Sequence, residues 1–306
     1  GSAPSLCDLL VSFVRRLSGD EAEGEATRGA FALLDALRDR HGTHTMRRLC
    51  AALNGREEVA PKAGSRDAGN KDAGKDAGKW AGGKAMAQSR GETEARREVP
   101  PEFSQALLGL ADALLREEAR RAESDKASRR SLIESLFSHA CAAPAMQALL
   151  TSLPAESPQF DALVRALLHW PEPTEEASQS TPKAHPGKKQ QRPAPSVLSA
   201  KTVDHIRALC RDSAGSRAVE SIVSCAPQWW RPLFLRAFKD DLADMAAHPL
   251  ANFVVQALLS TAPTPTAVQR VQEQLNPSLA SLLESRAGVV LQLAQASARL
   301  GCGGST

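Results

Sequence analysis

Pairs of positions four residues apart, most of them with polar side chains, recur three times in the C-terminal third of the chain. Successive pairs are 36 residues apart: Ser216 with Glu220, Asn252 with Gln256, and Gly288 with Gln292. Residues four apart lie on the same face of an α-helix, and hydroxyl, amide and carboxylate groups there offer hydrogen-bond donors and acceptors. No carboxylate pair, Ser-His-Asp order or metal-ligand cluster has a useful spacing, so the sequence predicts a binding protein without catalytic residues, metal or cofactor.

The segments around these pairs repeat one phrase, which begins at Arg211, Ala247 and Leu283. In each copy an apolar helical pattern ends at a polar turn, and a second helix follows from a small residue. A repeat of this length indicates a solenoid, in which each unit buries its apolar face only by stacking on its neighbours. The polar pairs of successive second helices would then form a ladder along one wall.

Two earlier segments match the same phrase. In residues 40–49, Thr43 and Arg47 occupy the paired positions, and His44 follows the first of them. A His41–His44 metal site is the alternative, but it lacks a third ligand. Residues 139–150 align with residues 248–259 but keep only Gln147 of the polar pair.

Composition sets the limits of the fold. The 306 residues give room for two ordinary domains or one repeat array, and 42% of them are hydrophobic, with no Tyr. Abundant Ala and Leu favour packed helices. The formal charge of +3 is too small for indiscriminate coating of nucleic acid. The six cysteines are scattered, so neither a disulfide framework nor a zinc site is predicted. No apolar run has membrane-spanning length, so no membrane partner is expected.

Shifts in composition divide the chain. The segment that contains residues 67–79 is a mixed-charge run with almost no apolar content, which cannot offset its ordering entropy by burial. The predicted parts are N-terminal repeats (1–53), a disordered low-complexity insertion (54–99), degenerate repeats (100–170), a disordered linker (171–195), C-terminal repeats (196–300) and a flexible tail (301–306). The predicted fold is all-α: a right-handed α-solenoid of degenerate helical repeats with disordered insertions.

The register of the pairs resembles that of the Pumilio-type (PUF) family of RNA-binding repeat proteins. In such repeats two side chains four apart read a base edge, and the residue after the first stacks on the base. The resemblance implies that Ser216 and Glu220 read an edge while Arg217 stacks. Ionised Glu only accepts hydrogen bonds, which suits the donors of guanine. Arg217 as a phosphate contact or a solvated charge stays an alternative.

The same resemblance assigns the other copies. Asn252 and Gln256, with Phe253 as the stacking residue, resemble the uracil-reading combination, although an isolated Phe is more often part of a core. Gly288 has no side chain, so the third copy keeps only Gln292. In the earlier copies the resemblance implies RNA contact without base identity for Thr43, His44 and Arg47, and a structural role or backbone contact for Gln147.

Degenerate repeats with long insertions resemble the nucleolar protein 9 branch of this superfamily. That likeness implies a monomeric protein of the nucleolus or nucleus that binds single-stranded or partly structured precursor rRNA of the small subunit, with pre-ribosomal proteins as further candidate partners. The alternative is a HEAT- or armadillo-like scaffold that holds a peptide on its concave face.

Overall fold

A computed structural model describes residues 6–18, 32–56, 97–124, 131–171 and 198–302. Helices and turns make up these residues, and none of them forms a β-strand. The predicted insertion at 54–99 and linker at 171–195 fall almost entirely on residues 57–96 and 172–197, which lie outside the described residues. Their predicted disorder therefore stays a prediction.

The helices follow a repeating order of first, second and third helix. The first helices are residues 32–38, α6 (Leu132–Ser138), α9 (Ala200–Arg211), α12 (Leu242–Ala247) and α15 (Leu279–Ser285). The second helices are α3 (Arg40–Leu53), α7 (Ala142–Ser152), α10 (Gly215–Cys225), α13 (Asn252–Ser260) and α16 (Ala287–Arg299). The third helices are α5 (Pro101–Ser124), α8 (Pro158–Leu168), α11 (Pro227–Leu233) with the π-helix η2 (Phe234–Phe238), and α14 (Pro265–Leu275) with the 3₁₀ turn η3 (Asn276–Ser278).

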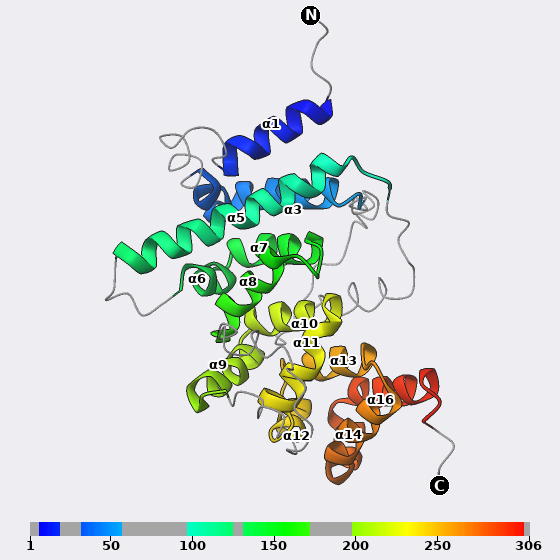
Figure 1. The fold of residues 1–306 in the computed structure, drawn as a ribbon. Helices are drawn as coiled ribbons and strands as arrows, with labels where there is room; N and C mark the ends of the chain where they lie inside the picture. The colour runs from blue at the N-terminus through cyan, green and yellow to red at the C-terminus, as the bar shows by residue number, and fades with distance from the viewer. Residues whose placement is uncertain (1–5, 19–31, 57–96, 125–130, 172–197, 303–306) are drawn as a thin grey trace, which may run out of the picture.

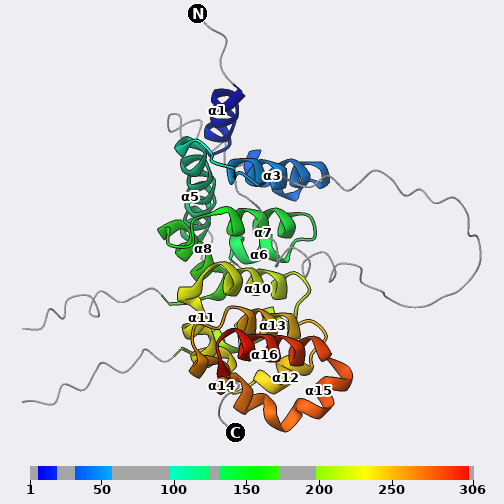
Figure 2. The ribbon, with the colours of Figure 1, turned by 90° about the vertical axis from the view of Figure 1, so that its right-hand side faces the viewer.

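The second helices stack in chain order into one layer. α3 contacts α7, α7 contacts α10, α10 contacts α13 and α13 contacts α16. Figure 2 shows these helices one below another, and Figure 1 shows the same succession from α3 to α16 down the molecule. The predicted α-solenoid is thereby confirmed. At its N-terminal end, α1 (Leu6–Ser18) packs against α5.

Four of the five described second helices, α3, α7, α10 and α13, begin after a side chain that caps free backbone N–H groups. The Asp212 carboxylate accepts hydrogen bonds from the N–H groups of Ala214 and Gly215, at 2.9 and 2.8 Å. His248 Nδ1 accepts from Leu250 and Ala251 at 3.2 and 3.3 Å. Asp39 and His139 make the same pair of bonds before α3 and α7. The first N–H groups of a helix lack partners within it, so these bonds fix where α3, α7, α10 and α13 start.

The small residue at the start of each second helix is explained by its contact with the first helix. A Cβ added at Gly215 would lie 2.6 Å from the carbonyl oxygen of Leu209 in α9. The equivalent residues, Gly42, Ala142 and Ala251, lie at or near the starts of their helices and also have little or no side chain. The two helices of a repeat can therefore approach closely at this corner.

Indole rings hold successive repeats together through the third helices. Trp230 of α11 is buried and donates from Nε1 to the carbonyl of Leu258 in α13, at 2.8 Å. Trp229 packs edge-on against Trp170, with ring centroids 5.1 Å apart, and so ties α11 to the end of α8. The contact between Trp229 and Trp170 spans the linker and joins the described repeats on its two sides into one packed array.

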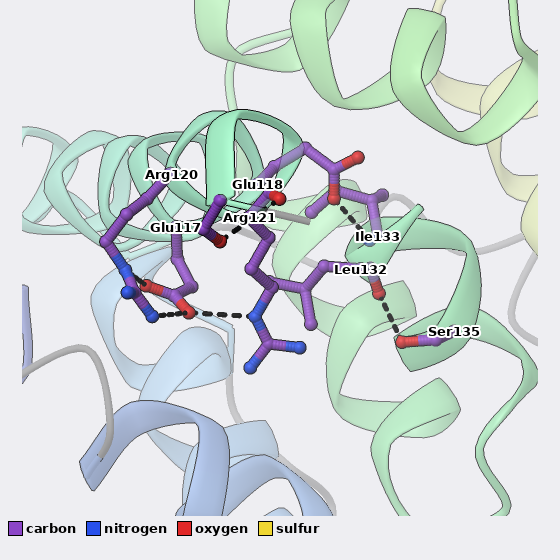
Figure 3. A network of polar contacts seen from close by, with 8 residues as sticks. Glu117, Glu118, Arg120, Arg121, Leu132, Ile133 and Ser135 are labelled. Atoms are coloured by element: carbon purple, nitrogen blue, oxygen red, sulfur yellow. Dashed lines mark hydrogen bonds and ion pairs between the residues drawn. The ribbon is translucent and has the colours of Figure 1, made fainter. Parts of the chain in front are cut away.

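Charged side chains near the end of α5 pair within the helix and reach the start of α6 (Figure 3). Glu117 is buried, and its carboxylate accepts hydrogen bonds from Arg120 and Arg121. The hydrogen bond from Arg120 is the main reason that the pKa of Glu117 is lowered. The neighbouring Glu118 accepts from the backbone N–H of Ile133, at 3.1 Å, at the start of α6. The long helix is thereby joined to the next repeat.

Two histidines stack at the junction of α8 and α9. The rings of His169 and His205 are parallel, with centroids 3.9 Å apart, and His169 Nε2 lies 3.3 Å from Glu134. His169 ends α8 with a left-handed backbone, at φ 51°. Burial, and next the proximity of His205, lower the pKa of His169, while Glu134 opposes this shift. The junction therefore favours the neutral imidazole.

Candidate RNA-binding face

The capping residues place equivalent side chains at the same point of four second helices, and the spacing of α16 follows the same register. We call Asp39, His139, Asp212 and His248 the cap residues, and count Glu284 as their equivalent before α16. The first edge position is four residues after the cap residue, the platform position five after it, and the second edge position eight after it. All sequence-predicted site residues fall at these positions, and the stacking of α3, α7, α10, α13 and α16 brings them into one layer.

On α13 the predicted pair of amides is hydrogen-bonded internally. Asn252 is only 4% exposed, and its Nδ2 donates to the carbonyls of His248 and Pro249, at 2.8 and 2.9 Å. Its Oδ1 accepts from Gln256 Nε2 at 2.9 Å. Both Asn252 N–H bonds are therefore used, and the half-buried Gln256 amide keeps one N–H donor and the carbonyl acceptor Oε1. The pair presents a fixed donor beside an acceptor.

The platform positions of α10 and α13 differ from the edge positions in exposure. Phe253 is 41% exposed, which is unusual for a large apolar ring in an otherwise buried helix. Arg217, at the same position of the neighbouring helix α10, is also exposed. Phe253 is therefore not a buried core residue, and stacking of these two side chains on bases stays a prediction.

On α10 the edge positions carry a hydroxyl and a carboxylate. Ser216 is 4% exposed, and its Oγ donates to the carbonyl of Ser213 at 3.5 Å. Glu220 is half-buried. Because the Ser216 proton is directed to the backbone, the oxygens of this pair are mainly acceptors.

On α3 and α7 the edge side chains hold neighbouring second helices together. Thr43 is buried, and its Oγ1 donates to the carbonyl of Cys141 at 2.6 Å. Gln147 Nε2 donates to the carbonyl of Ala214 at 3.4 Å. Cys141 and Ala214 each lie two residues after a cap residue, so the two bonds are equivalent steps along the layer. Part of the hydrogen-bonding capacity of Thr43 and Gln147 is thus used between repeats.

The remaining predicted residues lie at the two ends of the layer. His44 is exposed and Arg47 half-buried on α3. On α16, Gln292 is half-buried, whereas Val289 at the platform position is fully buried. The last second helix therefore has no exposed platform, and RNA contact by Gln292 stays a prediction.

The cap residues were missed in the sequence, although their signal was present. Asp212 and His248 are 36 residues apart, in the same register as the polar pairs. A carboxylate and an imidazole do not look alike, but both offer an acceptor to backbone N–H groups. At Asp39 the backbone N–H groups of Gly42 and then His41 lower the pKa of the carboxyl.

Among the described residues, no cluster of His, Cys, Asp and Glu could hold a metal ion. In the same residues no helix has the length and apolar character needed to cross a membrane.

Known proteins are similar to this chain in sequence and in fold. A family model for the NOP9-like PUF repeat domain matches residues 9–306. Nucleolar protein 9 of Homo sapiens is 37% identical over 93 residues, which are 30% of this chain and 15% of that protein. Pumilio homolog 23 of Arabidopsis thaliana is 36% identical over 92 residues, 29% of this chain and 12% of that protein.

A solved structure, APUM23-GGAGUUGACGG, has a TM-score of 0.57 with 19% identity, over 96% of this chain and 47% of that one. This likeness shows the fold. The chain spans less than half of that structure, and the matched segments are a small part of both curated relatives.

Proposed function

Because the chain belongs to the family of NOP9-like PUF repeat domains, we propose that it binds single-stranded RNA along its stacked second helices. The observation that carries the proposal is the combination of Phe253 and Arg217, exposed at the platform positions of adjacent helices, with polar pairs beside them. Aromatic rings and guanidinium planes are the groups on which unstacked bases lie in RNA-binding proteins. The APUM23 structure carries the oligonucleotide GGAGUUGACGG, which supports RNA as the partner class.

The hydrogen-bonding groups on α13 and α10 support a uracil beside a guanine. Uracil presents the N3–H donor flanked by carbonyl acceptors, which matches the Oε1 acceptor and the remaining N–H of Gln256. Guanine presents the N1–H and N2–H donors, which match the carboxylate of Glu220. Since α10 and α13 are in contact, the two bases would be neighbours.

The precursor rRNA of the small subunit is the proposed RNA, and the nucleolus or nucleus is the proposed location. The names of the relatives called nucleolar protein 9 support this assignment. Crosslinking of the protein to RNA in its own cells, followed by sequencing, tests it. Enrichment of small-subunit precursor reads over mature rRNA is expected, and a profile dominated by messenger RNA would contradict the assignment.

Binding itself is tested by fluorescence anisotropy with labelled CCCUGCCC, CCCGUCCC and CCCCCCCC. The two orders of U and G cover both directions of the strand along the helices. One of the two orders should bind more tightly than the cytidine-only RNA, and its affinity should fall steeply between about 50 and 200 mM salt as phosphate contacts are screened. Absence of binding to all three RNAs at low salt would favour the scaffold alternative.

The control variant for this experiment is Glu273→Gln. Glu273 is exposed on the third helix α14, outside the layer of second helices. The substitution Glu273→Gln changes the net charge by the same amount as Glu220→Gln does. Its binding to the preferred RNA should equal that of the wild type.

A further inference from the structure

Gly288 lies directly against the amide of Gln256. A Cβ built on Gly288 would lie 3.1 Å from Gln256 Nε2 and 3.3 Å from both Gln256 Cδ and Oε1. These three atoms are the complete side-chain amide group of Gln256. Gly288 therefore lies against the whole amide and not against one of its atoms. Contacts this short oblige one of the two partners to move by a few tenths of an ångström.

The Gln256 amide has little freedom to move in response. Its Nε2 is bonded to Asn252 Oδ1 at 2.9 Å, and Asn252 is held in turn by two backbone carbonyls. A displaced amide would lengthen the bond to Asn252 or rotate the remaining donor and acceptor out of their plane. Because hydrogen bonds weaken steeply as their angle closes, a small rotation matters for a base edge.

No requirement of the helix itself explains the glycine. Gly288 is the second residue of α16, exposed, and its φ is not positive. At such a position Ala is the better helix former, and in the other copies the first edge position carries a side chain. The reason for a glycine at position 288 is therefore its contact with the neighbouring Gln256.

We propose that Gly288 is a positioning residue for base recognition by the preceding repeat, because it leaves room for the Gln256 amide to keep its orientation and its hydrogen bond to Asn252. This inference rests on the proposed function, because it names what sets the specificity of the same face. The fifth second helix thus contributes to uracil selection through the absence of a side chain, although it lacks a first edge group of its own. The unit of recognition spans two helices, α13 and α16.

The test measures the affinity ratio between the preferred U-and-G RNA and the RNA in which that U is replaced by C. The proteins are the wild type, Gly288→Ala, Gln256→Ala and the double variant. A good bidentate pair discriminates against a wrong base by roughly 5- to 150-fold, and we expect Gly288→Ala to reduce the ratio by about three- to tenfold. In the Gln256→Ala background the glycine substitution should change nothing further.

Two controls separate positioning from loss of fold. The ratio for replacing the neighbouring G by A should be unchanged in Gly288→Ala, because Glu220 lies on α10, beyond α13. The variant Ala294→Ser adds an atom to another exposed site of α16 and should leave the U-over-C ratio unchanged.

The outcomes distinguish failure of the inference about Gly288 from failure of the proposed RNA-binding function. A Gly288→Ala ratio within twofold of wild type, with the ratio abolished in Gln256→Ala, would overturn the inference and leave the proposed function standing. A further loss of the ratio on adding Gly288→Ala to Gln256→Ala would also overturn it. If the wild type itself did not prefer U over C, the proposed function would fail and the inference with it.

Discussion

Removal of the exposed ring on α13 should weaken RNA binding and, by a comparable free energy, the fold. Stacking of one base on an aromatic side chain contributes about 1–3 kcal/mol, so Phe253→Ala should weaken binding by roughly 5- to 150-fold. Phe253 is 41% exposed, and burial of a whole Phe side chain contributes about 1.5–3 kcal/mol. The covered part therefore corresponds to about 1–2 kcal/mol of folding stability.

A conservative series separates the two effects. Phe253→Leu keeps an apolar side chain against the neighbouring helices but loses the flat ring, whereas Phe253→Trp enlarges the ring. We expect Leu to bind as weakly as Ala while melting close to the wild type, and Trp to retain binding. Anisotropy titration and thermal melting of the same samples measure both quantities. Equal RNA affinity of Phe253→Leu and wild type would refute stacking at this position.

Three further substitutions test the scaffold that positions the face. Gly215→Ala places a Cβ 2.6 Å from the carbonyl oxygen of Leu209, and denaturant unfolding should show a loss of about 1–3 kcal/mol; unchanged stability would contradict the close approach. Asp212→Ala removes the cap of α10 and should cost about 0.5–2 kcal/mol, whereas a neutral result would show the cap to be dispensable. His169 has a lowered pKa when folded, so wild-type stability should fall as the pH drops below about 6.5. His169→Asn, which suits the left-handed backbone, should flatten that dependence of the melting temperature, and an equal slope would exclude His169 as its source.

The repeat register could be read from the sequence because it depends on local patterns. The 36-residue spacing of Ser216 and Asn252 and the small residue before each were sufficient to place the second helices. The Ala- and Leu-rich composition was sufficient for the all-α fold. These features survive in one sequence because every copy must pack on the next one in the same way.

The contacts between repeats could not be predicted from local patterns. Thr43 donates a hydrogen bond to the carbonyl of Cys141, 98 residues away. The sequence around either residue contains no pattern that predicts this bond. The third helix between α10 and α12 was not predicted because α11 contains Pro232 and continues as the π-helix η2, which disturbs the helical period. In the sequence, Gly288 indicated only that this copy lacks the first base-contacting side chain. The positioning role that we propose for it depends on its distance from Gln256.

The most direct test of base reading is the guanine preference of Glu220→Gln. The affinity ratio between the preferred U-and-G RNA and the RNA with A in place of G should be high for the wild type. In the variant it should fall by about 5- to 150-fold, because the amide offers only one acceptor oxygen and adds donors that guanine N1–H and N2–H cannot accept. Glu273→Gln should keep the wild-type ratio. An unchanged ratio in Glu220→Gln, or an equal fall in Glu273→Gln, would contradict recognition of bases by the second helices.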